Sequence, residues 1–554
     1  MTKIRTLNMR LLRSGRTIEQ AFSPSFVPGE ERALEERPWS PIDGARLFVG
    51  QIYTTTPPWM TFIGSGADDL PTDMFAGGAG AVIFVPVGQR VMAVCFGHAH
   101  IALNFDAFER QFGLKVTLNS VPRDKLRSLD LATPDAVTFQ KRVQASKDSD
   151  IQAFGVDMLR DLARVAGGTP KSRSFARFVA GQDNLSMTCE VDEKTLAAKC
   201  AEALAAFGKA TYRKEFAWVD NMRIVAEKDL LEQLDTLLFA DLSKLRNGQD
   251  SELHLAPPEI VNYTEGCQLH YNGFGSHGTD FFSLSIEDYV AELVRCKFAG
   301  GIDEIKEKHR IAAKADASDD FTEKWRLYDC FVFEVSVHVG GVEKSYVLFA
   351  GNWYQVEQQF KQSVEAFFDR IEKVSIIGPT LCRNEVALID EIDANRADLL
   401  KLDRQKINPG GVRYASLEPC DFFSQNKEFI HLKDGHSSGP ISHLWFQGVV
   451  SAEAFVSDGE FRKKLRAMVR SLGRGFETHL PKSSESPKRH LYKVVYGIMR
   501  KPYADGTLGL PFFSKVSLQA AVERIEQFNI PVAIELIEKP SSDANDEVGE
   551  KAAA

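Results

Sequence analysis

The sequence has no long apolar run. No window of about eighteen uncharged apolar residues occurs in its 554 residues, and the first residues lack the apolar centre of a signal peptide. We therefore expect a protein that is neither exported nor embedded in a membrane. The expected location is the cytoplasm.

Closely spaced cysteine pairs and nucleotide-binding glycine motifs are also missing. The eight cysteines are scattered without any CxxC pair, which argues against a disulfide framework and against a thiolate zinc site. The glycines of residues 272–278 are not followed by the Lys-Ser/Thr pair that opens a helix in a phosphate loop. No repeat of fixed period is present. The sequence therefore gives no sign of a P-loop nucleotidase or a repeat protein.

The composition is that of a globular protein with an uneven charge distribution. Apolar residues make up 44% and charged residues 26% of a chain with a formal net charge of −9. Residues 462–501 nevertheless contain twelve Lys or Arg against two Glu. Such a run indicates either a solvated face or contact with a polyanion. We predict nucleic-acid contacts from Arg462, Lys463, Lys464, Arg466, Arg470, Arg474, Lys488 and Arg489.

The patterning predicts a multidomain α+β protein. Residues 1–167 are expected to form an N-terminal α+β domain with an antiparallel hairpin at 81–96, a strand at 112–121 and a helix at 150–168 that ends at a Gly-Gly pair. Residues 168–320 form a mixed, largely helical region with helices at 193–207 and 228–242. Residues 321–379 are predicted to be a hairpin and helix that pack on a neighbouring domain. Residues 380–539 are expected to form an α/β domain with a mixed sheet, and 540–554 a disordered tail.

Residues 413–447 carry the densest set of chemically capable side chains. Two strands are predicted at 414–423 and 428–433, followed by a helix from residue 440. Asp421 stands near the end of the first strand. His431 and Lys433 lie two apart on the second strand and so share a face, while His443 and Gln447 share a helix face at i, i+4.

The predicted order from residue 384 is helix, three strands, helix, strand, helix, strand. Together with the side chains above, this order is similar to the core of the restriction-endonuclease-like, or PD-(D/E)xK, nucleases. The resemblance implies that Asp421 is the first acid, Lys433 the lysine, Glu385 an additional acid and Gln447 a helical glutamine of the site. His431 departs from the family, because it occupies the position of the second acid.

This resemblance implies metal-dependent hydrolysis of phosphodiesters. The expected ion is Mg²⁺ or Mn²⁺, held by Asp421 with Glu385 or Glu418, and Mn²⁺ would tolerate an imidazole better. Lys433 would stabilise charge on the attacked phosphate.

Three other interpretations stay open at this point. In the first, Asp421 caps a turn, His431 is a core histidine and Lys433 reaches the surface along its apolar stem. In the second, His431-x-Lys433 resembles half of the HxK signature of phospholipase D-like nucleases, with histidine as the nucleophile. In the third, the domain has lost its second acid and only binds nucleic acid or a partner.

The chain also resembles, over nearly its whole length, an uncharacterised bacterial family described as sporadically distributed. The segments FGLKVTLNSV, FGVDMLRDL, RKEFAWVDN, GNWYQV, EPCDFFSQNKEFIHLK, ISHLWFQGVVSAEAF and LPFFSKVSL carry this resemblance. It implies a setting in anti-phage defence, with further proteins of a defence system as partners, and it names no reaction. Nucleic acid as a partner, with DNA favoured over RNA, is expected from the basic segment and the nuclease-like residues instead. Whether the protein is an oligomer is left open.

Overall fold

The computed structural model describes residues 3–57, 60, 63, 65–66, 71, 73–134, 138–249, 251–262, 268–275, 279–314, 321–409, 416–435, 438–482, 485–503 and 506–540. The expected disordered tail beyond residue 540, and residues 414–415 of an expected strand, lie outside this range. No helix in the described part of the chain is long and apolar enough to span a bilayer.

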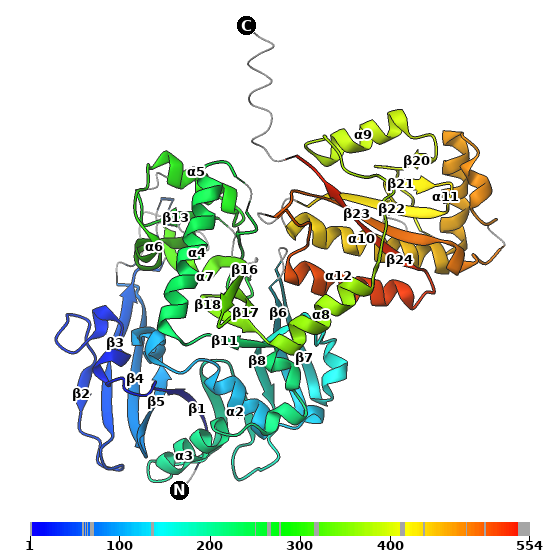
Figure 1. Cartoon of the computed structure of the whole chain (residues 1–554). Helices are drawn as coiled ribbons and strands as arrows, with labels where there is room; N and C mark the ends of the chain where they lie inside the picture. Colours follow the sequence, from blue (N-terminus) through cyan, green and yellow to red (C-terminus); the bar gives the residue numbers. More distant parts are fainter. Residues whose placement is uncertain are drawn as a thin grey trace.

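The N-terminal part is one ten-stranded antiparallel sheet, whose strands run β2-β3-β4-β5-β1-β10-β9-β8-β6-β7 (Figure 1). The strands are β1 Lys3–Leu11, β2 Glu35–Arg37, β3 Arg46–Thr55, β4 Ala76–Val87, β5 Arg90–Gly97, β6 Leu126–Thr133, β7 Phe139–Ser149, β8 Leu162–Gly168, β9 Phe178–Gly181 and β10 Leu185–Val191. β4 and β5 form the predicted hairpin. Helices α2 Phe112–Ser120 and α3 Leu196–Phe207 pack on this sheet. The sheet continues past residue 167, so the expected domain boundary falls inside β8.

Two predicted elements of this region are wrong. The stretch predicted as a strand at 112–121 forms α2, because most of its residues are buried and packing overrides the strand preference of its valines. Conversely, the end of the predicted helix at 150–168 is β8, which pairs with β6 and β9. Gly167 and Gly168 do not end a helix. Because they lack a side chain, they allow β8 to lie close to the segment that begins β6. A Cβ on Gly168 would lie 2.4 Å from the carbonyl oxygen of Lys125.

The middle part contains two smaller antiparallel sheets. The first has the order β11-β18-β17-β16-β12 and the second β13-β14-β15. These strands are β11 Met222–Ile224, β12 His254–Leu255, β13 Leu269–Asn272, β14 Arg310–Lys314, β15 Phe321–Arg326, β16 Phe331–Val339, β17 Val342–Phe349 and β18 Asn352–Val356; the helices are α4 Lys228–Arg246, α5 Ile286–Arg295, α6 Ile302–Lys308 and α7 Leu327–Cys330. The predicted hairpin β16–β17 is therefore the centre of a sheet that also draws strands from the preceding region.

The C-terminal part has the expected mixed sheet, in the order β19-β24-β23-β22-β21-β20. β21 runs antiparallel to both of its neighbours, and the other pairs are parallel. The strands are β19 Glu372–Lys373, β20 Leu399–Lys401, β21 Phe422–Ser424, β22 Glu428–Asp434, β23 Lys493–Arg500 and β24 Val532–Glu538; the helices are α9 Glu385–Asn395, α10 Ser438–Ser457, α11 Gly459–Leu472 and α12 Phe512–Glu526. α9 covers one face, and α10 and α12 cover the other. The first of the three expected strands, which the sequence pattern predicts at 402–407, is instead shorter and earlier, as β20.

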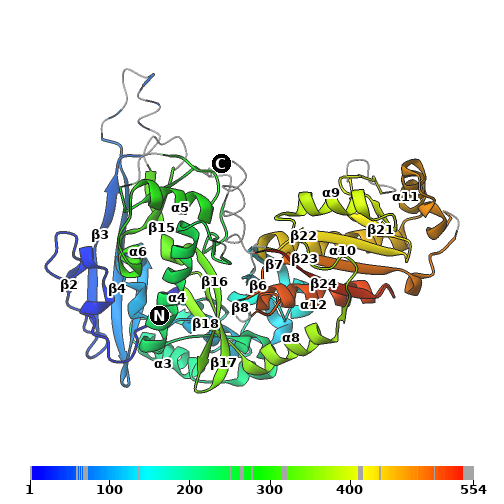
Figure 2. The same cartoon turned by 45° about the horizontal axis from the view of Figure 1, so that its top comes forward.

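This C-terminal part forms a separate lobe beside the rest of the molecule, joined through α8 Gln358–Arg370 (Figures 1 and 2). At the junction, Glu334 of β16 accepts the N–H groups of Phe512 and Phe513 at 2.6 and 3.1 Å. Arg500 also bonds Glu252 at 2.8 Å. These contacts satisfy free N–H groups at the start of α12 and attach the lobe to the middle sheet.

Candidate functional site in the C-terminal sheet

Three carboxylates meet at one edge of the C-terminal sheet. Asp403 follows the end of β20, Asp421 precedes the start of β21, and Glu418 lies on the loop between these strands. Because the two strands are antiparallel and Lys401 pairs with Phe422, the chain ends that carry the two aspartates lie side by side. One carboxylate oxygen from each residue lies within 4.8 Å of the others.

Asp421 is the most enclosed of the three. Its carboxylate accepts the N–H of Leu432 at 2.6 Å, and only 9% of the residue is exposed. Burial raises the pKa of Asp421 to about 7, and the nearby Glu418, Glu385 and Asp403 add to this rise, whereas the bond from Leu432 opposes it. Burial also raises the pKa of Glu418. The neighbouring carboxylates therefore disfavour ionisation of Asp421 and Glu418, while Glu418 also accepts the backbone N–H of Arg404.

Lys433 lies beside this cluster, at the end of β22. Its ammonium bonds both oxygens of Glu385, at 2.9 and 3.1 Å, and Glu385 stands in the first turn of α9. Glu385 also accepts the N–H of Asp434 at 3.3 Å. Glu385 and Lys433, two of the expected site residues, are therefore in direct contact, and the charge of Glu385 adds to the rise in the pKa of Asp421. A second cation lies at the carboxylate cluster, because Arg404 pairs with Asp403 at 3.7 Å.

His431 does not join this group. Its side chain faces α10 from the middle of β22 and is 2% exposed, with Nε2 at 3.3 Å from Ser451 Oγ and the ring 6.0 Å from that of Tyr496. Burial lowers the pKa of His431 to about 3. The predicted catalytic role of His431 is therefore wrong, because an interior imidazole can reach neither substrate nor metal. The HxK interpretation fails for the same reason.

Gln447 and His443 lie on α10. Gln447 is half-buried one turn before Ser451, and His443 is exposed. Among the described contacts neither residue bonds a carboxylate of the cluster. Asp403 is the site residue that sequence reasoning missed. Its one sequence signal is an acid directly after a short apolar run.

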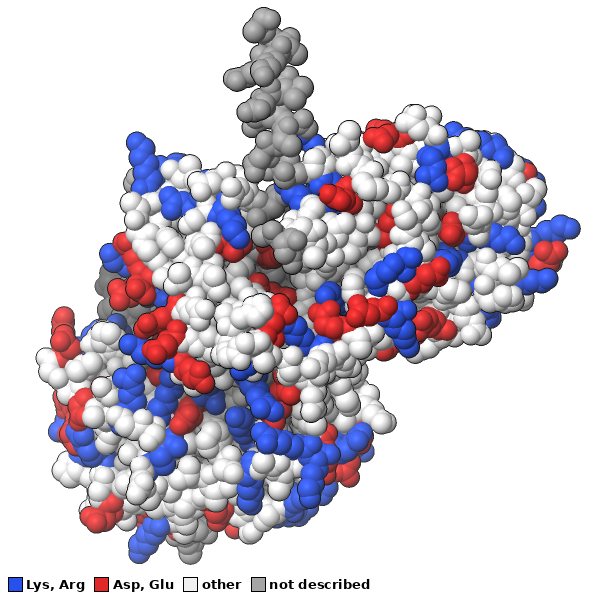
Figure 3. Space-filling view, viewed as in Figure 1, with Lys and Arg blue, Asp and Glu red and all other residues white. Residues whose placement is uncertain are grey.

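Half of the predicted nucleic-acid-binding residues make backbone contacts inside the lobe. Arg462, Arg466, Arg474 and Lys464 donate to backbone carbonyls: Arg462 to Phe455 and Val456, Arg466 to Glu477 and Leu480, Arg474 to Leu399 and Lys464 to Asn408. The other four, Lys463, Arg470, Lys488 and Arg489, are exposed, as is Lys464. The bond from Lys464 of α11 to the carbonyl of Asn408 measures 2.8 Å and places this helix against the loop that carries Glu418. On the face in Figure 3, basic and acidic residues are interspersed over the C-terminal lobe.

The donor set suits a hard divalent cation. Asp403, Glu418 and Asp421 offer only carboxylate oxygens, the ligands that Mg²⁺ and Mn²⁺ prefer. In an ion site here, Asp403 and Glu418 would be the carboxylates that accompany Asp421. Glu385, which the sequence also predicted as a ligand, is instead paired with Lys433.

We expect Asp421→Asn to stabilise the metal-free protein. The folded pKa of about 7 lies above the ordinary 3.8, so the folded state loses stability as the pH rises from about 4 to about 7. One pH unit is worth about 1.4 kcal/mol, which sets an upper bound of about 4 kcal/mol, and we expect a gain of about 1–3 kcal/mol. Asparagine keeps the acceptor for the N–H of Leu432.

Urea unfolding in the presence of a chelator, at pH 4.5 and pH 8, measures this effect. The gain should be small at pH 4.5 and full at pH 8. An equal effect at both pH values would mean that the carboxyl group of Asp421 is not held protonated by its surroundings.

Comparison with known proteins gives a family without an assigned activity. The chain matches a family of unknown function, DUF6119, over residues 7–538. No curated protein and no solved structure matches it.

Proposed function

The chain belongs to this family of unknown function, and from its site we propose that the C-terminal lobe is a metal-dependent nuclease that hydrolyses phosphodiesters. One observation carries the proposal: Lys433 stands at the same sheet edge as the carboxylates of Asp403, Glu418 and Asp421. A cation beside a carboxylate cluster matches what phosphodiester hydrolysis needs, namely ligands for a metal ion and a donor for the phosphate oxygens.

The sheet topology supports the proposal. β20, β21 and β22 follow one another in sequence and in space, and β21 is antiparallel to both. β23 continues parallel to β22 after α10 and α11, and β24 continues parallel to β23 after α12. Apart from the additional helix α11, this is the order expected from the resemblance to the restriction-endonuclease-like nucleases. Asp421, just before β21, and Lys433, near the end of β22, lie at the edge where the carboxylates meet.

The carboxylates and the lysine of the site have separate roles in this proposal. Asp403, Glu418 and Asp421 would hold Mg²⁺ or Mn²⁺, and the bound ion would supply Lewis acidity and a more acidic water. The N–H of Leu432 fixes the carboxylate of Asp421. Glu385 holds the ammonium of Lys433 at the site, from which it can donate to a phosphate oxygen where negative charge develops.

Incubation of the purified chain with plasmid DNA and with RNA, in Mg²⁺ or Mn²⁺, tests the proposal. We expect cleavage that a chelator abolishes, with DNA preferred. If neither polymer is cut with either metal, also in the presence of phage-infected cell extract, the site is not catalytic, and the nucleic-acid-binding module with a degenerate nuclease fold remains.

The proposal includes nucleic-acid binding by the exposed basic residues. We expect the triple variant Lys463→Glu, Lys464→Glu and Arg470→Glu to bind duplex DNA more weakly and with a flatter salt dependence. Each lost phosphate contact lowers the slope of log K against log salt by about 0.9. Fluorescence anisotropy at a series of salt concentrations measures both quantities.

Three exposed lysines of the other lobe, Lys194, Lys209 and Lys228, provide the matched control when changed to glutamate. The control carries the same change in net charge. Equal affinity and equal slope in the two triple variants would show that the basic helix α11 is only a solvated face.

A further inference from the structure

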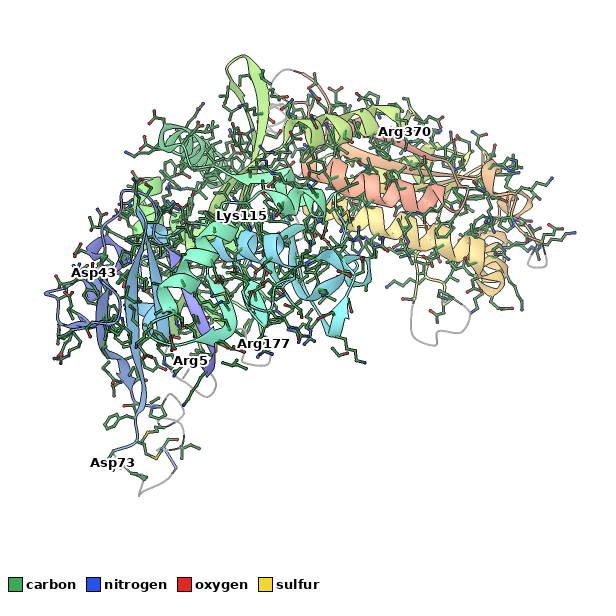
Figure 4. All side chains as sticks on the ribbon, turned by 90° about the horizontal axis from the view of Figure 1, so that it is seen from below. Arg5, Asp43, Asp73, Lys115, Arg177 and Arg370 are labelled. Atoms are coloured by element: carbon green, nitrogen blue, oxygen red, sulfur yellow. The ribbon has the colours of Figure 1, made fainter. Side chains whose placement is uncertain are left out.

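A large polar cavity lies far from the carboxylate site, between the N-terminal and middle parts. Its volume is about 960 Å³, and its walls come from the start of α2, the segment around β11, and α4, α6 and β18. Lys115, seen from below in Figure 4, belongs to the α2 wall. Cavities of this size at the junction of two structural units are the usual place for a small-molecule site.

The acidic side chains of this cavity are almost all neutralised by the protein itself. Asp106 pairs with Arg110 at 2.7 Å and with Arg326 at 3.3 Å. Asp220 accepts from the hydroxyl of Tyr212 at 2.7 Å and from Arg213 at 2.6 Å.

Asp235 is satisfied in the same way. It accepts from the hydroxyl of Tyr328 at 2.6 Å and from the indole N–H of Trp353 at 3.0 Å, and it also pairs with Lys306. Glu109 pairs with Arg90 at 2.6 Å. Glu307 is the acidic lining residue for which the described contacts give no side-chain partner.

Two basic side chains of the lining are left over. Lys115 and Arg223 make no hydrogen bond or ion pair among the described residues, although both contribute to the cavity wall. Lys115 is half-buried, and its ammonium lies 5.9 Å from the ring centroid of Phe207. Burial lowers the pKa of Lys115. A third basic residue, Arg13, donates its Nε–H to the carbonyl oxygen of Phe108 at 2.9 Å.

We propose that this cavity binds a small molecule that carries a polyphosphate group, with Lys115 and Arg223 as its charged contacts. Among the described lining residues, Lys115 of α2 and Arg223 of β11 are cations without an ion-pair partner, against one such acid, Glu307. A guanidinium matches two phosphate oxygens at once, and an ammonium adds a point charge, so a chain of phosphates can bridge the two walls. The volume leaves room for a nucleoside attached to the phosphates.

The position of the cavity gives such a ligand a structural effect. The ion pair between Arg326 and Asp106 already joins the middle part to the N-terminal part at this cavity. A ligand held by Lys115 and Arg223 would add a further connection between the same two parts, because α2 packs on the large sheet and β11 belongs to the middle sheet. Ligand binding should therefore raise the unfolding temperature of the full chain.

Isothermal titration of the full chain with ATP and with inorganic triphosphate tests the proposal. The two probes share the phosphates and differ in the nucleoside, so a preference for ATP identifies a nucleotide and equal affinity identifies the phosphate chain alone. The double variant Lys115→Gln and Arg223→Gln should bind the preferred probe at least about tenfold more weakly, because two charge-assisted contacts are lost.

The matched control is Lys194→Gln with Arg173→Gln, two exposed cations outside the cavity lining. The control should bind as the wild type does, and both double variants should keep the wild-type circular dichroism spectrum. The proposal is overturned if the wild type binds neither probe, or if the cavity variant binds as tightly as the control. Neither variant alters the carboxylate site. The outcome for this cavity is therefore independent of whether the C-terminal lobe has nuclease activity.

Discussion

Lys433→Ala should lower metal-dependent cleavage by about 10²–10³-fold and leave the fold intact. The loss follows from removing a cation that donates to the phosphate where charge develops, an effect of about 3–4 kcal/mol in comparable sites. The stability cost should stay within about 1 kcal/mol, since the pair with Glu385 is partly solvated, with side-chain exposures of 29% and 24%. Single-turnover cleavage and urea unfolding measure the two quantities separately.

Lys401→Ala is the matched control for this variant. Lys401 lies on β20, pairs with Asp390 of α9 at 2.8 Å, and has a side-chain exposure of 28%. It therefore loses a similar ion pair to the same helix, outside the carboxylate cluster. If the two variants cleave equally well, Lys433 is a structural residue. The nuclease mechanism then has no hydrogen-bond donor to the phosphate at that position.

The same pair of variants tests the biological setting. If the protein acts in anti-phage defence through this site, cells that carry Lys401→Ala should survive infection as wild-type cells do, and cells that carry Lys433→Ala should not. Full protection by Lys433→Ala, together with wild-type DNA affinity, would assign the lobe to binding alone.

His431→Glu should destabilise the protein by about 3–5 kcal/mol instead of supplying a second acid to the metal site. The new carboxylate would lie where 2% of the residue is exposed, with the hydroxyl of Ser451 as its one polar neighbour in the described contacts. An ionised group without a partner in such a place carries the full cost of losing water. Urea unfolding at pH 8 measures this cost, because at that pH a glutamate in the unfolded chain is ionised.

His443→Glu provides the comparison, because His443 is exposed on the same helix that covers His431. It should change the free energy of unfolding by no more than about 0.5 kcal/mol. A different outcome, in which His431→Glu is as stable as wild type and shifts the metal preference from Mn²⁺ to Mg²⁺, would show that this strand position does reach the ion.

Local pattern was sufficient for several elements in all three parts of the chain. The hairpin β4–β5, the helices α3 and α4, and the series β22, α10, β23, α12 and β24 were predicted from alternation, helical spacing and turn residues. The proximity of Asp421 and Lys433 followed from their places on adjacent strands. The period of the pattern identifies elements with one buried side, whereas β23 and β24, which are buried on both faces, are recognised as short apolar runs.

Long-range packing decided the rest. The residues of α2 have a strand-like pattern but form a helix, because they pack on the large sheet. The glycines of β8 are needed because segments distant in sequence lie against them. His431 and Lys433 share a strand face, yet α10 covers the first, while the second reaches past the strand end to Glu385. Asp403 joined the site through the pairing of β20 with β21. The sequence by itself determined the kind of most elements and pointed to the acid and lysine of the candidate site, Asp421 and Lys433. Only the tertiary structure decided which side chains lose contact with water and which carboxylates meet, because both depend on contacts between segments that the chain order does not specify.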